Sequence, residues 1–335
     1  MKEDSSILFL GDVMPNKPYR FKTTYKTIFN LECPITKVGK PVQGKVILRA
    51  KETYLHKIFG QSLFCANLGN NHILDFGKEG LDSTLAALEE LKIKWFGITS
   101  PMDDEYKPLI IELNDLKLAF ISVVCPSTSP VTGINNSGRL ALLDEERIMV
   151  KISKVKNSVH RIIIFIHWGI EESSFPAEKE IMQARRLIDA GVHVVIGSHA
   201  HAPQPIEKYK GGIIAYNLGN FIMPPLLQLP SYYGEDGLPK SSYTKRLMGW
   251  NRASWGLIID LKNLDYTIKK FFFIFNRIVE LPVTPWDKYL KLQYKDNHSL
   301  YEKDIRKHLR KRELMRKVID FLAKPYIPEI IKKML

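Results

Sequence analysis

The sequence has few cysteines, and none of them are arranged as a pair. Cys33, Cys65 and Cys125 are the only three in 335 residues, they are widely spaced, and no CxxC motif occurs. An odd number of separated cysteines argues against a disulfide framework. We therefore interpret all three as small buried hydrophobic residues.

Long hydrophobic runs are also missing. No segment reaches the roughly 18 apolar residues that span a bilayer, and the apolar residues 7–10 are too few for the core of a signal peptide. We therefore expect a soluble, cytoplasmic chain. A chain whose leader had been removed would look the same, so association with the cell surface stays open.

Acidic residues are outnumbered by basic ones. The chain has 49 Lys and Arg against 36 Asp and Glu, a formal charge of +13. Residues 286–335 contain 14 basic and 7 acidic residues, so this tail supplies +7 of the total. A basic balance suits an acidic partner such as a nucleic acid, a membrane surface or an anionic polymer. For the tail, a solvated helix face is the simpler interpretation.

Short apolar runs rich in β-branched residues alternate with helical patterns. The runs have the character of strands buried on both faces, and they are residues 7–10, 118–124, 162–166, 192–196 and 213–216. Between them, residues 81–91 and 181–188 repeat apolar side chains at the spacing of one helix face. This alternation predicts a layered α/β fold with its ligands at the strand ends.

The pattern changes towards the C-terminus. Residues 260–274 read as further strands with a turn at Leu264 and Asp265, and the pattern after Pro285 is helical and charged. We predict a catalytic domain over residues 1–284 and a basic helical extension over residues 285–335. Residues 224–249, with their Pro, Gly, Ser and Tyr content, are predicted to form a long loop of the lid type.

Five short segments carry metal-type ligands. GD at 11–12, HWG at 167–169 and GSHAH at 197–201 begin where an apolar strand ends, and NLE at 30–32 and NNH at 70–72 lie in Asn-rich stretches. Carboxylate and imidazole groups suit Zn, Mn or Fe, and a carboxylate can bridge two ions roughly 3.5–4 Å apart. A single such histidine is more often structural than a ligand. The set of five favours a metal site, because the structural explanation would have to hold five times.

The order of these segments resembles that of the calcineurin-like metallophosphoesterases. The phrases GDVM, NLECPIT, NNHILDFG, HWGIE and GSHAHAPQPIEKYKGGIIAYNLGNFI are more closely similar to the CapA family of poly-γ-glutamate capsule biosynthesis proteins, over about residues 6 to 223. The resemblance implies a four-layer α/β/β/α sandwich with its site at one edge. It also implies two divalent metal ions, Mn, Fe or Zn.

The resemblance assigns a role to each matching residue. Asp12 and His201 would bind the first metal, Glu32 would bridge the two ions, and His72 would act as a general acid or oxyanion stabiliser. The second metal would be held by Asn71, His167 and His199.

Further polar positions match the same phrases. They are expected to hold the ligands in place, since metal-bound imidazoles usually donate their other N–H to a carboxylate or carbonyl; they are Asn30, Asn70, Asp75, Glu171, Gln183 and Asn220. For Asp75 and Asn220, a turn or capping role is an equal alternative.

Three departures affect the expected site. Met14 stands where the phosphoesterases have a histidine, so the first metal is expected to be held weakly. Glu32, after Asn30 and Leu31, replaces a bridging aspartate with a longer arm. Only 17 residues separate Asp12 from Asn30, which is short for a CapA-like chain.

Three functions remain open from the sequence. The first is a metal-dependent CapA-like protein that acts on an anionic polymer such as poly-γ-glutamate, with its basic tail against a membrane surface or a capsule-synthesis complex. The second is a phosphomonoesterase or phosphodiesterase, with a phosphate or carboxylate substrate. The third is a non-catalytic polymer-binding module. The resemblance favours the first and makes a nucleic-acid partner less suitable.

Overall fold

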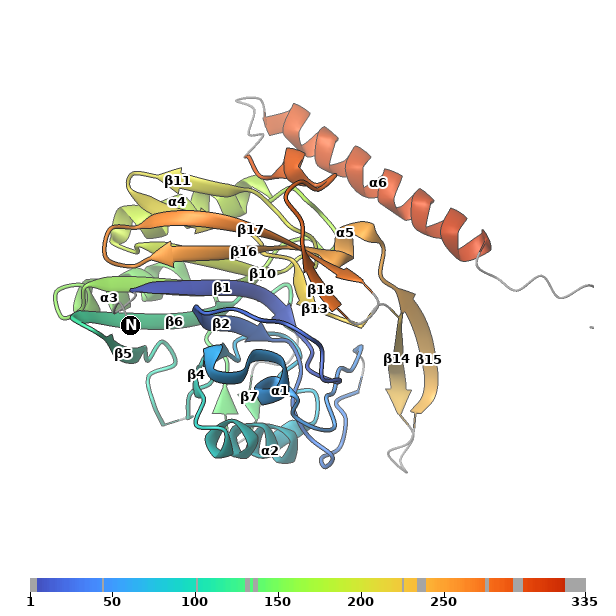
Figure 1. Ribbon diagram of the computed structural model, residues 1–335, viewed down its shortest axis with the longest axis horizontal. Coiled ribbons are helices and arrows are strands. Elements are labelled where there is room, and N and C mark those ends of the chain that lie inside the picture. Colours follow the sequence, from blue (N-terminus) through green and yellow to red (C-terminus); the bar gives the residue numbers. More distant parts are fainter. Residues whose placement is uncertain are drawn as a thin grey trace, which may run out of the picture. The chain divides into compact units, whose positions relative to one another are not determined.

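The computed structural model describes residues 5–43, 45–100, 102–129, 133–134, 138–224, 226–233, 239–274, 277–291 and 298–322 (Figure 1). The chain forms two compact units, Met1–Gln293 and Tyr294–Leu335. Among its described residues the first contains two large β-sheets, two two-stranded sheets and five α-helices, and the second contains one long helix, α6 (His298–Leu322). The boundary at residue 284 remains a prediction.

The larger sheet has eight strands. In spatial order they are β18 (Arg277–Glu280), β17 (Asp265–Ile274), β16 (Ala253–Asp260), β1 (Ser6–Val13), β2 (Lys26–Leu31), β3 (Leu63–Asn67) and β4 (Lys94–Phe96), with β13 (Asn220–Ile222) beside the end of β1. From β1 to β4 the strands are parallel, whereas β16, β17 and β18 are antiparallel. The turn between β16 and β17 lies at residues 261–264, close to the predicted turn.

The second sheet has six strands. They are β11 (Ile206–Tyr209), β12 (Gly212–Ala215), β10 (Val194–His199), β9 (Arg161–Trp168), β6 (Leu116–Val124) and β5 (Leu109–Leu113). The four central strands are parallel, and an antiparallel strand closes each edge. All five predicted apolar runs overlap strands of these sheets, with residues 192–193 and 216 lying just outside them, which confirms that part of the sequence analysis.

The two sheets pack face to face. Ile7 and Phe9 of β1 share one buried core with Phe165 of β9 and Ile196 of β10, and the rings of Phe9 and Phe165 are 6.1 Å apart. Alternate residues of the same strands point the other way: Leu8 belongs to a separate core on the outer face of the larger sheet. Since both faces of these strands are buried, their sequences are continuously apolar.

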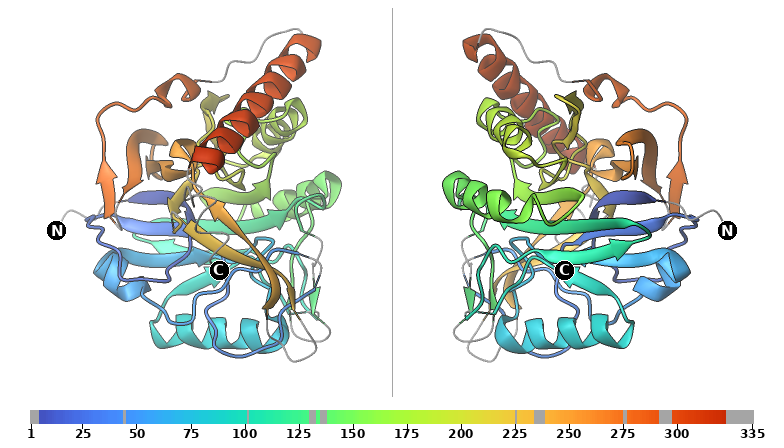
Figure 2. Two further views of the ribbon diagram at one scale, coloured as in Figure 1. Left: turned by 90° about the vertical axis from the view of Figure 1, so that its right-hand side faces the viewer. Right: turned by 90° about the vertical axis from the view of Figure 1, so that its left-hand side faces the viewer.

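Helices cover the two outer faces (Figure 2). Over the larger sheet lie α1 (Leu55–Phe59) and α2 (Gly77–Glu90), whose apolar residues belong to its outer core. Over the second sheet lie α3 (Glu145–Val155) and α4 (Glu178–Ala190), and α4 contacts β10 and β12. The architecture is therefore the predicted four-layer α/β/β/α sandwich.

One segment differs from its prediction. Residues 226–233 and 239–246 form an antiparallel hairpin, β14 (Leu226–Tyr233) and β15 (Pro239–Arg246), instead of a long loop. The loop prediction was wrong because proline is unusual within strands. Pro230 and Pro239 are tolerated here because the hairpin is an isolated ribbon with irregular register.

Short elements complete the described chain. They are η1 (Gly60–Ser62), β7 (Gly133–Ile134), β8 (Gly138–Arg139), α5 (Gly249–Arg252) and η2 (Asp287–Tyr289). Within the described ranges, no helix combines the length and the apolar character needed to cross a bilayer.

Candidate metal centre

The sheet register brings the first polar residues together. Asp12, near the end of β1, lies level with Asn30 on β2 and with Asn220 on β13. On the second sheet, His167 of β9 lies level with Ser198 of β10. Because parallel strands end at the same edge, side chains far apart in the sequence meet there.

Asp12 and Glu32 form a buried acidic pair linked by one amide. Nδ2 of Asn30 donates to Oδ1 of Asp12 at 2.8 Å and also to Oε2 of Glu32. Burial and the charge of Asp12 raise the pKa of Glu32 well above its ordinary value. Two buried carboxylates this close repel each other unless a cation binds to both. The pair is therefore suited to bind a cation.

Three ligand-type atoms at the site are buried and have no hydrogen-bond partner. They are Oδ2 of Asp12, Oε1 of Glu32 and Nδ1 of His199. Buried polar atoms rarely lack a hydrogen bond, and a binding site for an ion is one recognised explanation when they do. Ligand atoms of Asp12, Glu32 and His201 also lie within 4.8 Å of one another. These residues therefore fit a divalent metal ion.

A second group of candidate ligands also lies close to Glu32. Nε2 of His167 is 2.9 Å from Oδ1 of Asn71 and 3.7 Å from Oε1 of Glu32. Nδ1 of His167 lies 2.9 Å from Oγ of Ser198, which fixes the ring. The ring of His199 is 4.8 Å from that of His167. Glu32 is thus shared by both groups.

His201 completes the first group. Its Nε2 lies 3.9 Å from Oε1 of Glu32, and its Nδ1 lies 3.3 Å from Oδ2 of Asp12 and 2.8 Å from Oδ1 of Asn220. Burial favours the neutral ring, but Asp12 outweighs it and raises the pKa of His201. For Asp12, burial opposes ionisation, but His201 and Asn30 outweigh it and lower the pKa.

The other histidines of the site are held neutral. Burial lowers the pKa of His167 well below its ordinary value and that of His199 to about 4, and neighbouring histidines add to both shifts. A neutral imidazole offers a nitrogen lone pair to a metal ion. Both rings are therefore in the form that binds metal near neutral pH.

His72 is supported by a buried carboxylate and a lysine. Its Nδ1 is 2.8 Å from Oδ2 of Asp75, and Lys45 donates to Oδ1 of Asp75 at 2.5 Å and to the carbonyl oxygen of Asn71. Burial lowers the pKa of His72, and Asp75 offsets this in part. Asn70 accepts from the backbone N–H groups of His72 and Ile73, which fixes the loop.

Two site residues have unusual backbone geometry. His199 has φ of 93° and His201 has φ of 52°, the left-handed region that costs a non-glycine residue free energy. Such conformations cluster at functional sites, where the surrounding structure enforces them. Here they turn the two imidazoles of the His-Ala-His segment towards one site, with their rings 6.0 Å apart.

Most predicted site residues meet here, but two do not take the expected place. Gln183 lies on α4 and donates to Glu145 of α3 at 2.9 Å, so it links the two helices and holds no ligand. Glu171 pairs with Lys245 of β15 at 3.3 Å instead of with a ligand, although its charge still acts on the centre, where it opposes the lowering of the His199 pKa and adds to the raising of the Glu32 pKa. A matching phrase fixes a residue's identity but not the direction of its side chain, which explains both differences.

Several supporting residues were missed. Lys45 supports Asp75, Ser198 holds His167, Asn67 donates to Asn30 at 3.1 Å, and Asn251 donates to the carbonyl oxygen of His201 at 3.0 Å. Asn67 and Ser198 stand beside predicted ligand segments, at the ends of strands, and that position was a usable signal. No local pattern marks Lys45 or Asn251.

The fold and the site together define an α/β/β/α sandwich protein with a candidate divalent-metal centre at its strand ends. The family profile described as bacterial capsule synthesis protein PGA_cap matches residues 20–225. The chain therefore belongs to this family, which confirms the resemblance found in the sequence.

Known proteins support the assignment. The chain is 26% identical over 196 residues to the PGA biosynthesis protein CapA of Bacillus subtilis, a match that covers 58% of this chain and 52% of that protein. It is also 26% identical over 201 residues to the capsule biosynthesis protein CapA of Bacillus anthracis, covering 58% and 49%. The chain thus spans about half the length of the curated relatives it matches.

Among solved structures, the chain is similar to a 5'-nucleotidase precursor from Thermus thermophilus. Identity is 13%, the match covers 92% of this chain and 59% of that one, and the TM-score is 0.42.

Proposed function

We propose that this protein acts in the synthesis of an anionic polymer of the poly-γ-glutamate type, through a two-metal centre of the hydrolase kind. Family membership and the names of the Bacillus relatives support the polymer. The observation that carries the metal centre is that three buried ligand atoms, on Asp12, Glu32 and His199, have no hydrogen-bond partner, while ligand atoms of Asp12, Glu32 and His201 lie within 4.8 Å of one another.

The residues divide into two groups around Oε1 of Glu32. This atom lies 3.9 Å from Nε2 of His201, which pairs with Asp12, and 3.7 Å from Nε2 of His167, which contacts Asn71 and lies beside His199. Divalent ions held there would supply Lewis acidity to a bond under hydrolysis. The chain lacks an imidazole at Met14, so the first group has fewer ligands and the weaker expected affinity.

His72 is the residue placed to move a proton. Its Nδ1 faces Asp75, which leaves Nε2 as the ring atom available to a substrate. Asp75 fixes the orientation of the ring and, by favouring its protonated form, offsets part of the pKa lowering that burial causes, as a general acid needs. Lys45 in turn holds Asp75 and the carbonyl oxygen of Asn71.

Metal analysis tests the centre directly. Protein purified without chelator should contain about two transition-metal ions per chain, as a two-metal site requires. The His199→Ala and Asp12→Asn variants should lose metal, whereas His56→Ala, at an exposed position on α1, should not. Fewer than one ion per wild-type chain would overturn the proposal.

Activity assays then separate the substrates. Metal-loaded protein should hydrolyse γ-linked glutamate oligomers, with activity lost in His72→Ala. Hydrolysis of phosphate esters alone would replace the polymer function with a phosphoesterase. No turnover of either substrate, with metal bound, would leave a polymer-binding module.

The basic tail is a separate part of the proposal. If residues 286–335 contact the polymer or a membrane surface, their removal should abolish salt-sensitive binding and leave the metal content unchanged. Binding that persists at the same salt dependence would contradict this role.

A further inference from the structure

The connection between β1 and β2, residues 14–25, is basic and leads away from the metal centre. Between Asp12 and Glu32 the chain has four basic residues, Lys17, Arg20, Lys22 and Lys26, and no acidic one. Since β1 and β2 are parallel, the connection must run back along the sheet from the end that carries Asp12. Over six strand residues at ~3.3 Å each this is roughly 20 Å.

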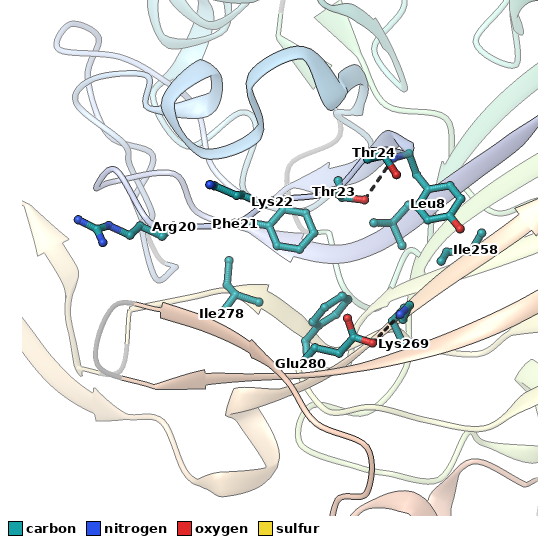
Figure 3. Close-up of a pocket in the computed structure, with 12 residues that line it drawn as sticks. Leu8, Arg20, Phe21, Lys22, Thr23, Thr24, Ile258, Lys269, Ile278 and Glu280 are labelled. Atoms are coloured by element: carbon teal, nitrogen blue, oxygen red, sulfur yellow. Dashed lines mark hydrogen bonds and ion pairs between the residues drawn. The ribbon is translucent and has the colours of Figure 1, made fainter. Parts of the chain in front are cut away.

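Two hollows flank this connection. One, of about 470 Å³, lies between residues 20–25 and strands β16, β17 and β18 (Figure 3). The other, of about 480 Å³, lies between residues 21–24 and helix α1. Residues 21–24 line both, so the hollows are neighbours on either side of one stretch of chain.

The floor of the first hollow is apolar. Leu8, Ile258 and Ile278 line it, and the ring of Phe21 turns inwards in Figure 3. Phe21 packs edge to face on Phe271, with the ring centres 5.7 Å apart, and in the same way on Phe59 at 5.9 Å. Pockets of this size with an apolar floor and a few polar groups are typical of ligand sites.

The rim is cationic. Arg20 and Lys22 extend outwards in Figure 3, and Lys57 of α1 stands at the second hollow. Within the described part of the chain, these three side chains have no salt-bridge partner. Lys269 is different, because it pairs with Glu280 at 2.6 Å. Four cations and one carboxylate therefore line the two hollows.

We propose that the β1–β2 connection and its two hollows form a binding subsite for an extended polycarboxylate chain. Carboxylates would pair with Arg20, Lys22 and Lys57, while methylene groups between them would cover Phe21. A γ-linked glutamate chain has this alternation of one carboxylate and a short methylene run in every unit. The identity of the polymer rests on the proposed function; the subsite itself rests on the charges and hollows described.

The position of the subsite would let it orient a long substrate at the candidate metal centre. The connection follows β1, which carries Asp12, and leads into β2, which carries Asn30, and Nδ2 of Asn30 donates to Oδ1 of Asp12 at the candidate metal centre. A chain bound along it would have one end at the sheet edge where that centre lies. Binding away from the reacting bond can be used to orient a long substrate.

Charge reversal tests the subsite. In full-length protein with its native metal, Arg20→Glu combined with Lys22→Glu should weaken binding of a fluorescent γ-glutamate oligomer by about tenfold or more, equivalent to about 1.4 kcal/mol. The matched control is Lys94→Glu combined with Lys208→Glu, two exposed strand lysines outside the hollows. The control should bind within about twofold of wild type. Metal content and thermal midpoint are measured on each protein.

A second variant should act in the opposite direction. Glu280→Gln removes the carboxylate that competes for Lys269 and should strengthen oligomer binding. Equal losses in the two double variants, or no loss in either, would overturn the subsite. The subsite would also be overturned if an RNA of equal charge bound as tightly and lost affinity equally in the Arg20→Glu and Lys22→Glu variant. Binding would then reflect non-specific electrostatic attraction. Wild-type protein that contains no metal would instead contradict the proposed function, and the comparison of oligomer binding between the variants would still test the subsite.

Discussion

Lys45 and His72 are joined through the two oxygens of one buried carboxylate. Lys45 donates to Oδ1 of Asp75 at 2.5 Å, and Oδ2 of Asp75 lies 2.8 Å from Nδ1 of His72. The same oxygen accepts from the backbone N–H of Leu48 at 2.7 Å. A residue 27 positions before His72 therefore sets the orientation of its ring.

Replacing this lysine should disturb the metal centre without touching a ligand. In Lys45→Met the carbonyl oxygen of Asn71 loses its donor, and metal affinity should fall by about 10–100-fold, as for other supporting groups. The pKa of His72 should rise, because the charge of Lys45 lowers it in the wild type. Metal titration and histidine NMR measure these effects. Lys51→Met, at an exposed position, is the control, and unchanged affinity in Lys45→Met would contradict the role.

Asn220 should control the ring of His201. Its Oδ1 lies 2.8 Å from Nδ1 of that histidine, so Asn220→Ala removes an acceptor. We expect a loss of metal affinity of about tenfold or more. Asn220→Asp keeps the acceptor and should retain most of the affinity by calorimetry. Equal behaviour of the two variants would rule out this hydrogen bond as the cause.

Glu180 should make stability depend on pH. It accepts from the backbone N–H of Ala177 at 2.9 Å, and burial raises its pKa from 4.5 to about 7. Between these values the folded protein binds the proton and the unfolded chain does not. The contribution of protonated Glu180 to the unfolding free energy is therefore complete below pH 4.5 and is lost as the pH rises through 7.

The isosteric variant isolates this effect. Relative to wild type, Glu180→Gln should gain on the order of 1–2 kcal/mol in unfolding free energy between pH 5 and pH 8. Urea unfolding at both pH values measures the difference. Glu89→Gln, at an exposed position on α2, should show no such gain. A gain equal at both pH values would show that ionisation is not involved.

Gly11 permits the close approach of two backbones beside Asp12. A Cβ at this position would lie 1.8 Å from the carbonyl oxygen of Gly219, which also accepts from the N–H of Asp12 at 3.0 Å. Because backbone cannot move aside easily, Gly11→Ala should cost about 1–3 kcal/mol or more in unfolding free energy. Gly211→Ala is a useful comparison, since no atom lies within 4 Å of its added Cβ, although its φ of 85° adds strain. A smaller loss in Gly11→Ala than in Gly211→Ala would contradict the steric explanation.

The sequence predicted the layers well because burial on both faces leaves continuous apolar runs in the strands. Runs such as residues 118–124 and 162–166 are continuously apolar since both faces of their strands are covered, and they are strands in the structure. The hairpin of β14 and β15 was missed for the opposite reason. It belongs to neither large sheet, so it carries no such run, and its prolines indicate a loop.

The candidate site was predictable where residues with ligand-type side chains follow directly on a strand. His167, His199 and Asp12 stand at strand ends, and the register brings them to one edge. Supporting contacts depend on how a side chain points. Gln183 was predicted to support a ligand but contacts Glu145 instead. Lys45 was not predicted, yet it reaches Asp75 from 30 positions earlier in the chain.

The unpaired atoms of Asp12, Glu32 and His199 have a consequence for the life of the protein in the cell. Each buried atom without a hydrogen bond disfavours the folded state. If a divalent ion binds there as proposed, and binds only the folded state, it restores the loss, by about 4 kcal/mol when present at a thousandfold excess over its dissociation constant. Chains made during metal starvation should therefore unfold more often and be degraded faster. The abundance of the protein would then follow the metal supply, before any question of catalytic rate arises.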